Sequence, residues 1–152
     1  MTALLPYILL ALIAGSAFPI QAGVNSRLSQ WTQSPVLASA ISFTVGALAL
    51  NLLTAVMRVP LPPLSSLSAQ PWWMWIGGLL GAVAVFSAIV LAPRLGAASM
   101  LALILSGQML ASLAMDQYGM LGYPVRPITL PKLVGGALVI GGIALIQFNR
   151  SG

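Results

Sequence analysis

The sequence predicts an all-α, polytopic membrane protein, and three observations carry this prediction. Hydrophobic residues make up 59% of the 152 residues and charged residues only 5%, and the mean hydropathy is +1.02. The apolar residues also form long blocks rather than amphipathic stripes, which is typical of helices surrounded by lipid. A water-soluble domain of this length could not cover such a composition with a polar surface.

Five apolar blocks are long enough to cross a hydrocarbon core of ~30 Å, which takes ~20 helical residues. We expect spans at about residues 4–24, 35–57, 72–92, 97–116 and 132–148, in a single membrane domain covering residues 1–152. Ser34 followed by Pro35 has the pattern of a helix cap with proline at the first helical position, so it sets the start of the second span.

The composition excludes most enzyme chemistry. There is no Cys and no His, so thiolate or imidazole metal sites and the usual Cys and His nucleophiles are not expected. Asp116 is the one acidic residue, which leaves no acid–base pair. We therefore expect neither enzyme activity nor a metal or cofactor. The basic residues are scattered between the blocks, which argues against nucleic-acid binding.

The basic residues also test the orientation of the chain, because cytoplasmic loops of membrane proteins are enriched in Lys and Arg. Five spans place Arg58, Arg126 and Lys132 on the N-terminal side and Arg27, Arg94 and Arg150 on the other side. This balance of three against three gives no preferred orientation. A chain that inserts both ways up could pair with itself antiparallel, and so build an inverted-repeat unit of ten helices.

Polar side chains inside the first two spans are few. Gln21 and Asn25 are four residues apart on one helix face, and Pro19 predicts a kink because proline removes a backbone hydrogen bond. This face either lines a cavity or only bonds to neighbouring helices. Ser39 and Ser42 of the second span are interpreted as packing residues, since such serines commonly bond to their own helix carbonyls.

In the fourth span, Gln108, Ser112 and Asp116 recur every four residues and form one polar stripe. Gln108 lies close to the middle of the span, and Asp116 lies ~12 Å further along, near the membrane interface. A carboxylate at that depth reaches water or a basic partner at low cost. We therefore interpret Asp116 as an ion-pair or gate residue, with a purely structural ion pair or a helix-end role left open.

Several segments together resemble one family of small integral membrane proteins, the YdcZ-type family. The resemblance covers about residues 5–148 and rests on FPIQAGVNSRL, SPVLASAISFTVGALAL, WWMWIGGLLGA, LAPRLGAASMLALILSGQMLASLAMDQYGMLG and KLVGGALVIGGIALI. It implies membership of the drug/metabolite transporter superfamily and a distant relation to the small multidrug resistance exporters. It also implies a five-helix half-unit that forms an antiparallel homodimer or pairs with a homologous five-helix subunit.

One departure from the multidrug exporters is informative. Those relatives carry a membrane-embedded Glu in their first helix, whereas the comparable stretch here, ALIAGSAFPIQAGVN, has no acid. Proton-coupled export of lipophilic cations by that mechanism is therefore not expected.

The expected function is secondary transport of a small polar molecule or metabolite across the bacterial inner membrane, by alternating access in an antiparallel homodimer. The substrate-binding residues would be Gln21, Asn25, Gln108 and Ser112. Asp116 would pair with Arg27 of the other subunit, because within one chain the two lie on opposite sides of the membrane. The alternative is a non-transporting assembly or regulatory subunit, in which the polar stripe only holds helices together.

Overall fold

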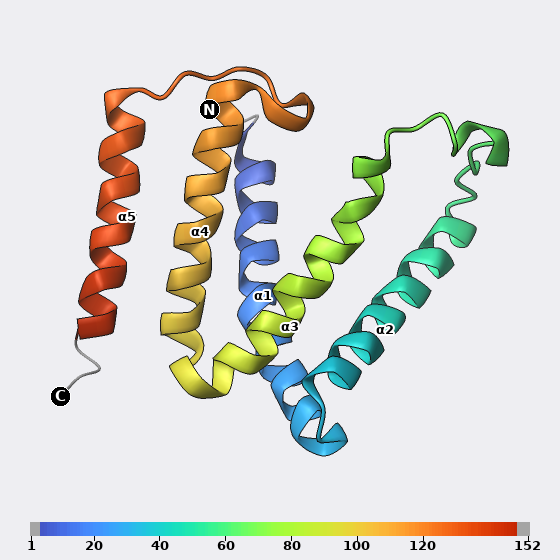
Figure 1. The fold of residues 1–152 in the computed structure, drawn as a ribbon, viewed down its shortest axis with the longest axis horizontal. Helices are drawn as coiled ribbons and strands as arrows, with labels where there is room; N and C mark the ends of the chain where they lie inside the picture. The colour runs from blue at the N-terminus through green and yellow to red at the C-terminus, as the bar shows by residue number, and fades with distance from the viewer. Residues whose placement is uncertain (1–3, 149–152) are drawn as a thin grey trace. The chain divides into compact units, whose positions relative to one another are not determined.

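The computed structural model describes residues 4–148, and its regular structure is entirely helical. The described part of the chain contains five α-helices, which are α1 (Leu5–Thr32), α2 (Pro35–Val56), α3 (Gly77–Leu95), α4 (Ala97–Tyr118) and α5 (Leu130–Phe148) (Figure 1). Short 3-10 helices η2 (Leu64–Ser66), η3 (Trp72–Ile76) and η4 (Met120–Gly122) lie in the connections or lead into α3.

The prediction of a polytopic helical membrane protein is confirmed. Four helical stretches are long and apolar enough to cross a membrane, namely Leu5–Thr32, Pro35–Val56, Trp72–Leu95 and Ala97–Tyr118. Only 6–17% of the apolar window of each is buried, so most of their hydrophobic side chains need lipid or another subunit as a cover. Residues Leu130–Leu145 of α5 form a shorter apolar helix. That α5 spans the membrane stays a prediction.

The first helix differs from the expected span, because it ends at Thr32 rather than near residue 24. The segment from Asn25 to Thr32 contains no proline or glycine to break the helix, and the Thr32 hydroxyl donates to the Leu28 carbonyl over 2.9 Å. At ~42 Å, a 28-residue helix is longer than a hydrocarbon core of ~30 Å. Arg27 is therefore part of a helix and not of a loop.

The start of α2 confirms the expected cap. The Ser34 hydroxyl accepts the Leu37 N–H over 3.2 Å, and Pro35 occupies the first helical position, where its missing N–H costs nothing. Gln33, just before it, adopts a left-handed conformation with φ 55° and ends α1. Two residues therefore suffice to reverse the chain between α1 and α2.

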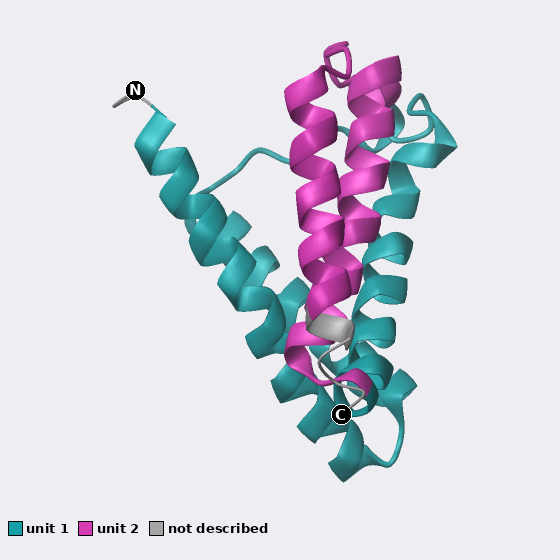
Figure 2. Cartoon of the chain, turned by 90° about the vertical axis from the view of Figure 1, so that its left-hand side faces the viewer, with its two compact units in different colours: residues 1–94 teal, residues 95–152 magenta. Residues whose placement is uncertain are grey.

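The chain divides into two compact units, residues 1–94 and residues 95–152 (Figure 2). In the first unit α1 packs against α2, and their buried residues, Ala22, Asn25, Ala38 and Ser39, lie towards the connection between the two helices. In the second unit α4 and α5 run side by side as an antiparallel pair (Figure 1). A single domain for the whole chain stays a prediction.

Candidate functional site

The amide of Asn25 is buried and joins two helices of the first unit. Its side chain is 4% exposed, and Nδ2 donates to the Ser42 hydroxyl of α2 over 3.0 Å. A buried amide would be costly without a partner, since nothing around it would replace the lost hydrogen bond to water. Asn25 and Ser42 therefore stabilise the α1–α2 pair, whatever else they do.

Gln21 lies one turn before Asn25, and both line a narrow hollow between α1 and α3. The lining consists of Phe18, Gln21, Ala22, Asn25, Val85 and Ala88. The hollow is too narrow to hold a water molecule. The shared face of Gln21 and Asn25 is thus present within the first unit, with Gln21 exposed and Asn25 buried. A substrate-binding role for these two residues stays a prediction.

Pro19 lies within α1, which continues through it from Leu5 to Thr32. Because proline has no N–H, the carbonyl of Gly15 lacks its usual helical donor. Ser16 does not replace that donor, since its hydroxyl donates to the Ile13 carbonyl over 2.8 Å. Pro19 therefore leaves the Gly15 carbonyl without its helical donor, as expected. The kink that we predict in α1 stays a prediction.

The second unit carries the other polar stripe. Gln108, Ser112 and Asp116 all lie in the continuous helix α4, so their four-residue spacing places them along one face. Gln108 is at the middle of α4, and both Gln108 and Ser112 are exposed. Among the residues that the structure describes, none hydrogen-bonds to the Gln108 side chain, so the second unit leaves this amide uncovered. Whether the amide binds a substrate is untested.

Asp116 has a partner within its own unit. Its carboxylate accepts from Nζ of Lys132 over 3.3 Å, and the two side chains are 32% and 35% exposed. Lys132 also donates to the Arg126 carbonyl over 3.2 Å, while the Arg126 N–H donates to the Asp116 carbonyl over 2.8 Å. These bonds fasten the α4–α5 connection to both helix ends.

The Asp116–Lys132 ion pair was not predicted, although a signal for it existed. The end of the fourth span and the start of the fifth must lie on the same side of the membrane. Asp116 and Lys132 were therefore both expected at that membrane surface. Arg27 contacts a different group, because its Nη1 donates to Oε1 of Gln30 over 3.4 Å. An Asp116–Arg27 pair between subunits stays a prediction, and it would have to share or displace Lys132.

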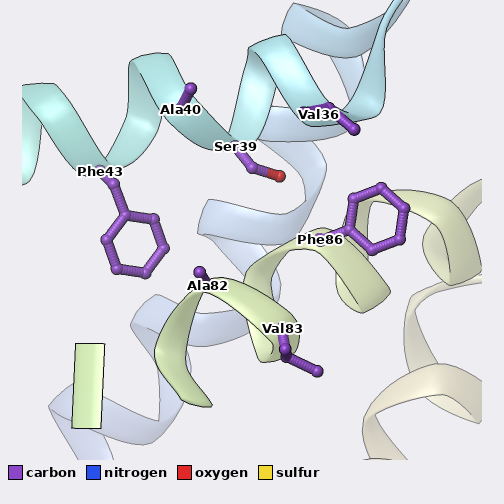
Figure 3. Close-up of a pocket in the computed structure, with 7 residues that line it drawn as sticks. All are labelled: Val36, Ser39, Ala40, Phe43, Ala82, Val83 and Phe86. Atoms are coloured by element: carbon purple, nitrogen blue, oxygen red, sulfur yellow. The ribbon is translucent and has the colours of Figure 1, made fainter. Parts of the chain in front are cut away.

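A second hollow, which the sequence did not predict, lies between α2 and α3 in the first unit. It has a volume of about 370 Å³, within the range of small-molecule sites. The residues lining it are Val36, Ser39, Ala40, Phe43, Ala82, Val83 and Phe86 (Figure 3). Two phenyl rings in the middle of apolar spans were the available signal, but sequence alone does not show that they border one hollow.

Side chains that commonly bind metals do not cluster in the described part of the chain. Within it, no group of three or more His, Cys, Asp or Glu side chains is placed to hold a metal ion. The candidate site residues within the helices offer amides, hydroxyls and the Asp116 carboxylate, which is paired with Lys132. Amides and hydroxyls both donate and accept hydrogen bonds.

Comparisons with known proteins identify a family for the chain. Residues 6–145 match a family described as "Putative inner membrane exporter, YdcZ". Inner membrane protein YdcZ of Escherichia coli (strain K12) is 33% identical over 79 residues, which are 52% of this chain and 52% of that protein. The chain thus spans about half the length of the curated relative it matches.

No solved structure matches the chain. The family match, by contrast, extends over nearly all of the described helices, from the first turn of α1 to the end of the apolar part of α5. Four long apolar helices and an inner-membrane family place the protein in the inner membrane as a multi-pass protein. The chain belongs to the YdcZ family of inner-membrane proteins.

Proposed function

We propose that this protein exports a small polar, neutral or zwitterionic molecule across the inner membrane, by alternating access in an antiparallel homodimer. The observation that carries the proposal is the uncovered Gln108 amide at the middle of α4, in a family described as inner-membrane exporters. An amide at that depth requires a hydrogen-bonding partner, which a second subunit or a transported molecule supplies.

The electrostatics support a cargo without a net positive charge. Asp116 is the one carboxylate of the chain, and Lys132 already contacts it at 3.3 Å. The described spans therefore offer no unpaired acid at mid-membrane to attract a cation or to carry a proton. Amides and hydroxyls such as Gln108, Ser112 and Gln21 suit a molecule recognised through hydrogen bonds.

The balanced basic residues support the antiparallel arrangement. Three Lys or Arg residues on each side leave the chain without a preferred orientation. Because the chain has no Cys, single cysteines at either terminus can be labelled selectively with a membrane-impermeant reagent. We expect each position to label from both sides of the membrane. Labelling from one side alone would refute the antiparallel dimer.

Transport is tested in reconstituted vesicles with a panel of metabolites, following uptake, current and internal pH. We expect flux of at least one polar metabolite by the wild type and its loss in Gln108→Ala. Asn51→Ala is the matched control, because the Asn51 amide donates to the Ala47 carbonyl of its own helix. Equal flux through Gln108→Ala and Asn51→Ala would refute the role of Gln108.

The second candidate function is a non-transporting assembly or regulatory subunit. The Asn25–Ser42 hydrogen bond favours it, because it shows a polar pair that holds two helices together. The ligand response separates the two functions. A transported molecule raises the melting temperature of the wild type and not of Gln108→Ala, whereas a purely structural stripe gives lower stability in the variant and no ligand effect.

A further inference from the structure

The connection between α2 and α3 exposes large apolar side chains although it lies between the long helices (Figure 1). Leu61 and Leu64 are 80% and 84% exposed, and Trp72 and Trp75 are 75% and 58% exposed. No charged residue occurs between Arg58 and Arg94. Exposed apolar patches usually mark a contact with a membrane or with another protein. The connection therefore needs a cover that the described residues do not supply.

The two leucines are three residues apart, as are the two tryptophans, and the backbone around each pair repeats every three residues. Leu61 precedes Pro63, whose φ of −57° and ψ of 138° are close to polyproline II, with three residues per turn. Leu64 begins η2, and Trp72 and Trp75 lie in η3. Both are 3-10 helices, in which residues three apart lie above each other. Leu61 and Leu64 thus form a leucine ridge, and Trp72 and Trp75 form a tryptophan ridge.

Polar groups of the connection lie beside the leucine ridge and bond to the backbone. Ser65 and Ser68 are offset from the ridge by one residue, or ~120° around a 3-10 axis. The Ser68 hydroxyl donates to the Ser65 carbonyl over 3.3 Å, and the Ser66 hydroxyl donates to the Pro63 carbonyl over 2.7 Å. These bonds satisfy carbonyls that water would otherwise have to reach. The segment thus has an apolar side and a polar side, as segments that lie in a membrane surface do.

The position of the connection in the chain favours lipid as the cover. It joins two stretches that are long and apolar enough to cross the membrane, Pro35–Val56 and Trp72–Leu95. The connection therefore lies at a membrane surface whichever way up the chain inserts, and lipid is always next to it. A specific protein interface buries ~800 Å² on each partner, and a ridge of two side chains offers far less.

The tryptophans and Arg58 also favour a lipid interface. Among the described residues, none accepts a hydrogen bond from the indole N–H of Trp72 or Trp75. Trp is enriched where its ring contacts acyl chains and its N–H reaches water or a headgroup. Arg58, just after α2, is the one charged residue of the connection, and its guanidinium is complementary to lipid phosphates.

We propose that the α2–α3 connection lies in the phospholipid headgroup region, with the leucine ridge and the tryptophan ridge directed towards the acyl chains and with Ser65 and Ser68 facing water. The partner of this surface is the bilayer itself. The inference concerns how the protomer sits in the membrane, so it does not depend on the transport function.

The leucine ridge is tested with spin labels on the full chain in phosphatidylcholine nanodiscs. Because the chain has no Cys, Leu61→Cys and Leu64→Cys can each be labelled alone, with Ser65→Cys and Ser68→Cys as matched controls. Collision rates are measured with molecular oxygen, which concentrates in lipid, and with nickel ethylenediaminediacetate, which stays in water. We expect the ratio of the oxygen rate to the nickel rate to be several-fold higher at the two leucine positions than at the two serine positions.

The tryptophan ridge is tested without labels. Trp31→Phe combined with Trp73→Phe leaves Trp72 and Trp75 as the two tryptophans of the chain. Their fluorescence is measured in phospholipids brominated either near the headgroup or near the methyl end of the acyl chain. We expect stronger quenching by the bromines near the headgroup. The spin-label series keeps all four tryptophans, so it tests the leucine ridge even if this variant does not fold.

Four results would overturn the proposal. High nickel collision rates at Leu61 and Leu64 would show that the ridge faces water. Low rates with both reagents at these positions would show that a second copy or another protein covers it. Equal ratios at the leucine and serine positions would contradict a ridge that repeats every three residues. Quenching of Trp72 and Trp75 that is absent, or stronger with bromines near the methyl end, would contradict their interfacial depth.

Discussion

The Asp116–Lys132 ion pair gives a sharp prediction about the one acidic residue of the chain. Asp116→Asn keeps the shape of the side chain and removes its charge, and Lys132→Met keeps most of the apolar stem and removes the ammonium. Each single variant also removes the other residue's charged partner. The double-mutant cycle isolates the coupling between the two, which single substitutions cannot do.

The structure sets the size of that coupling. Opposite unit charges at the observed 3.3 Å would attract by ~5 kcal/mol at an effective dielectric constant of about 20. Both side chains are about one-third exposed, so solvent screening and the cost of ordering two side chains offset most of this. We expect a coupling energy of ~0.5–1 kcal/mol, reduced further at high salt.

The assay is equilibrium unfolding by titration of dodecyl sulfate into mild detergent, followed by the fluorescence of the four tryptophans. A parallel cycle replaces Lys132→Met with Arg27→Gln and tests the pair predicted between subunits. Coupling to Lys132 that is independent of protein concentration is the expected result. A coupling energy of zero with Lys132, together with clear coupling to Arg27, would show that Asp116 acts across a subunit interface instead.

Three further predictions concern individual residues. Asn25→Ala should lower the free energy of unfolding by ~0.6–1.7 kcal/mol because it removes a buried interhelical hydrogen bond, whereas Asn51→Ala, whose amide bonds only to its own helix, should change it by less than ~0.5 kcal/mol; equal losses would contradict this. Gly119→Ala should cost ~1–3 kcal/mol, since φ is +60° there and a Cβ would lie 2.7 Å from Cγ2 of Val125; an unchanged unfolding midpoint would show that the α4–α5 connection adapts freely. Pro19→Ala should keep or raise helix stability, because it restores a backbone donor, and should reduce vesicle flux several-fold; undiminished flux would mean that the freed carbonyl has no part in transport.

Helix positions were largely predictable from the sequence because lipid imposes a simple rule. Any apolar block of ~20 residues must satisfy its backbone internally and so becomes helical. The end of α1 was not predicted, since that rule applies only inside the hydrocarbon. Beyond it, residues 25–32 carry enough polar groups to resemble a loop, yet nothing among them breaks the helix. Composition therefore predicts which residues lie in the membrane more reliably than it predicts where a helix ends and a loop begins.

For the candidate site, the sequence predicted which residues share a face of one helix, but not which residues of other helices they contact. Four-residue spacing places Gln21 with Asn25, and Gln108 with Ser112, and both pairs lie in continuous helices. The partner of each group depends on how one helix is rotated against its neighbour. Spacing within one helix does not encode that rotation. For this reason the Asn25–Ser42 bond was missed, as was the hollow between α2 and α3.

The polar groups of the spans fall into two classes, those bonded to a partner within their own unit and those for which that unit has no described partner. Asn25 bonds to Ser42, and Asp116 bonds to Lys132, so these groups are satisfied within one unit of the chain. Gln108 and Ser112 are exposed on a helix whose other exposed side chains are mostly apolar. An exposed mid-membrane amide is unfavourable in lipid, and a replacement by Leu would remove that cost. No described residue of the second unit offsets that cost, so we expect the compensating hydrogen bond to come from a group outside this unit, such as one that a second subunit or a cargo molecule brings to α4.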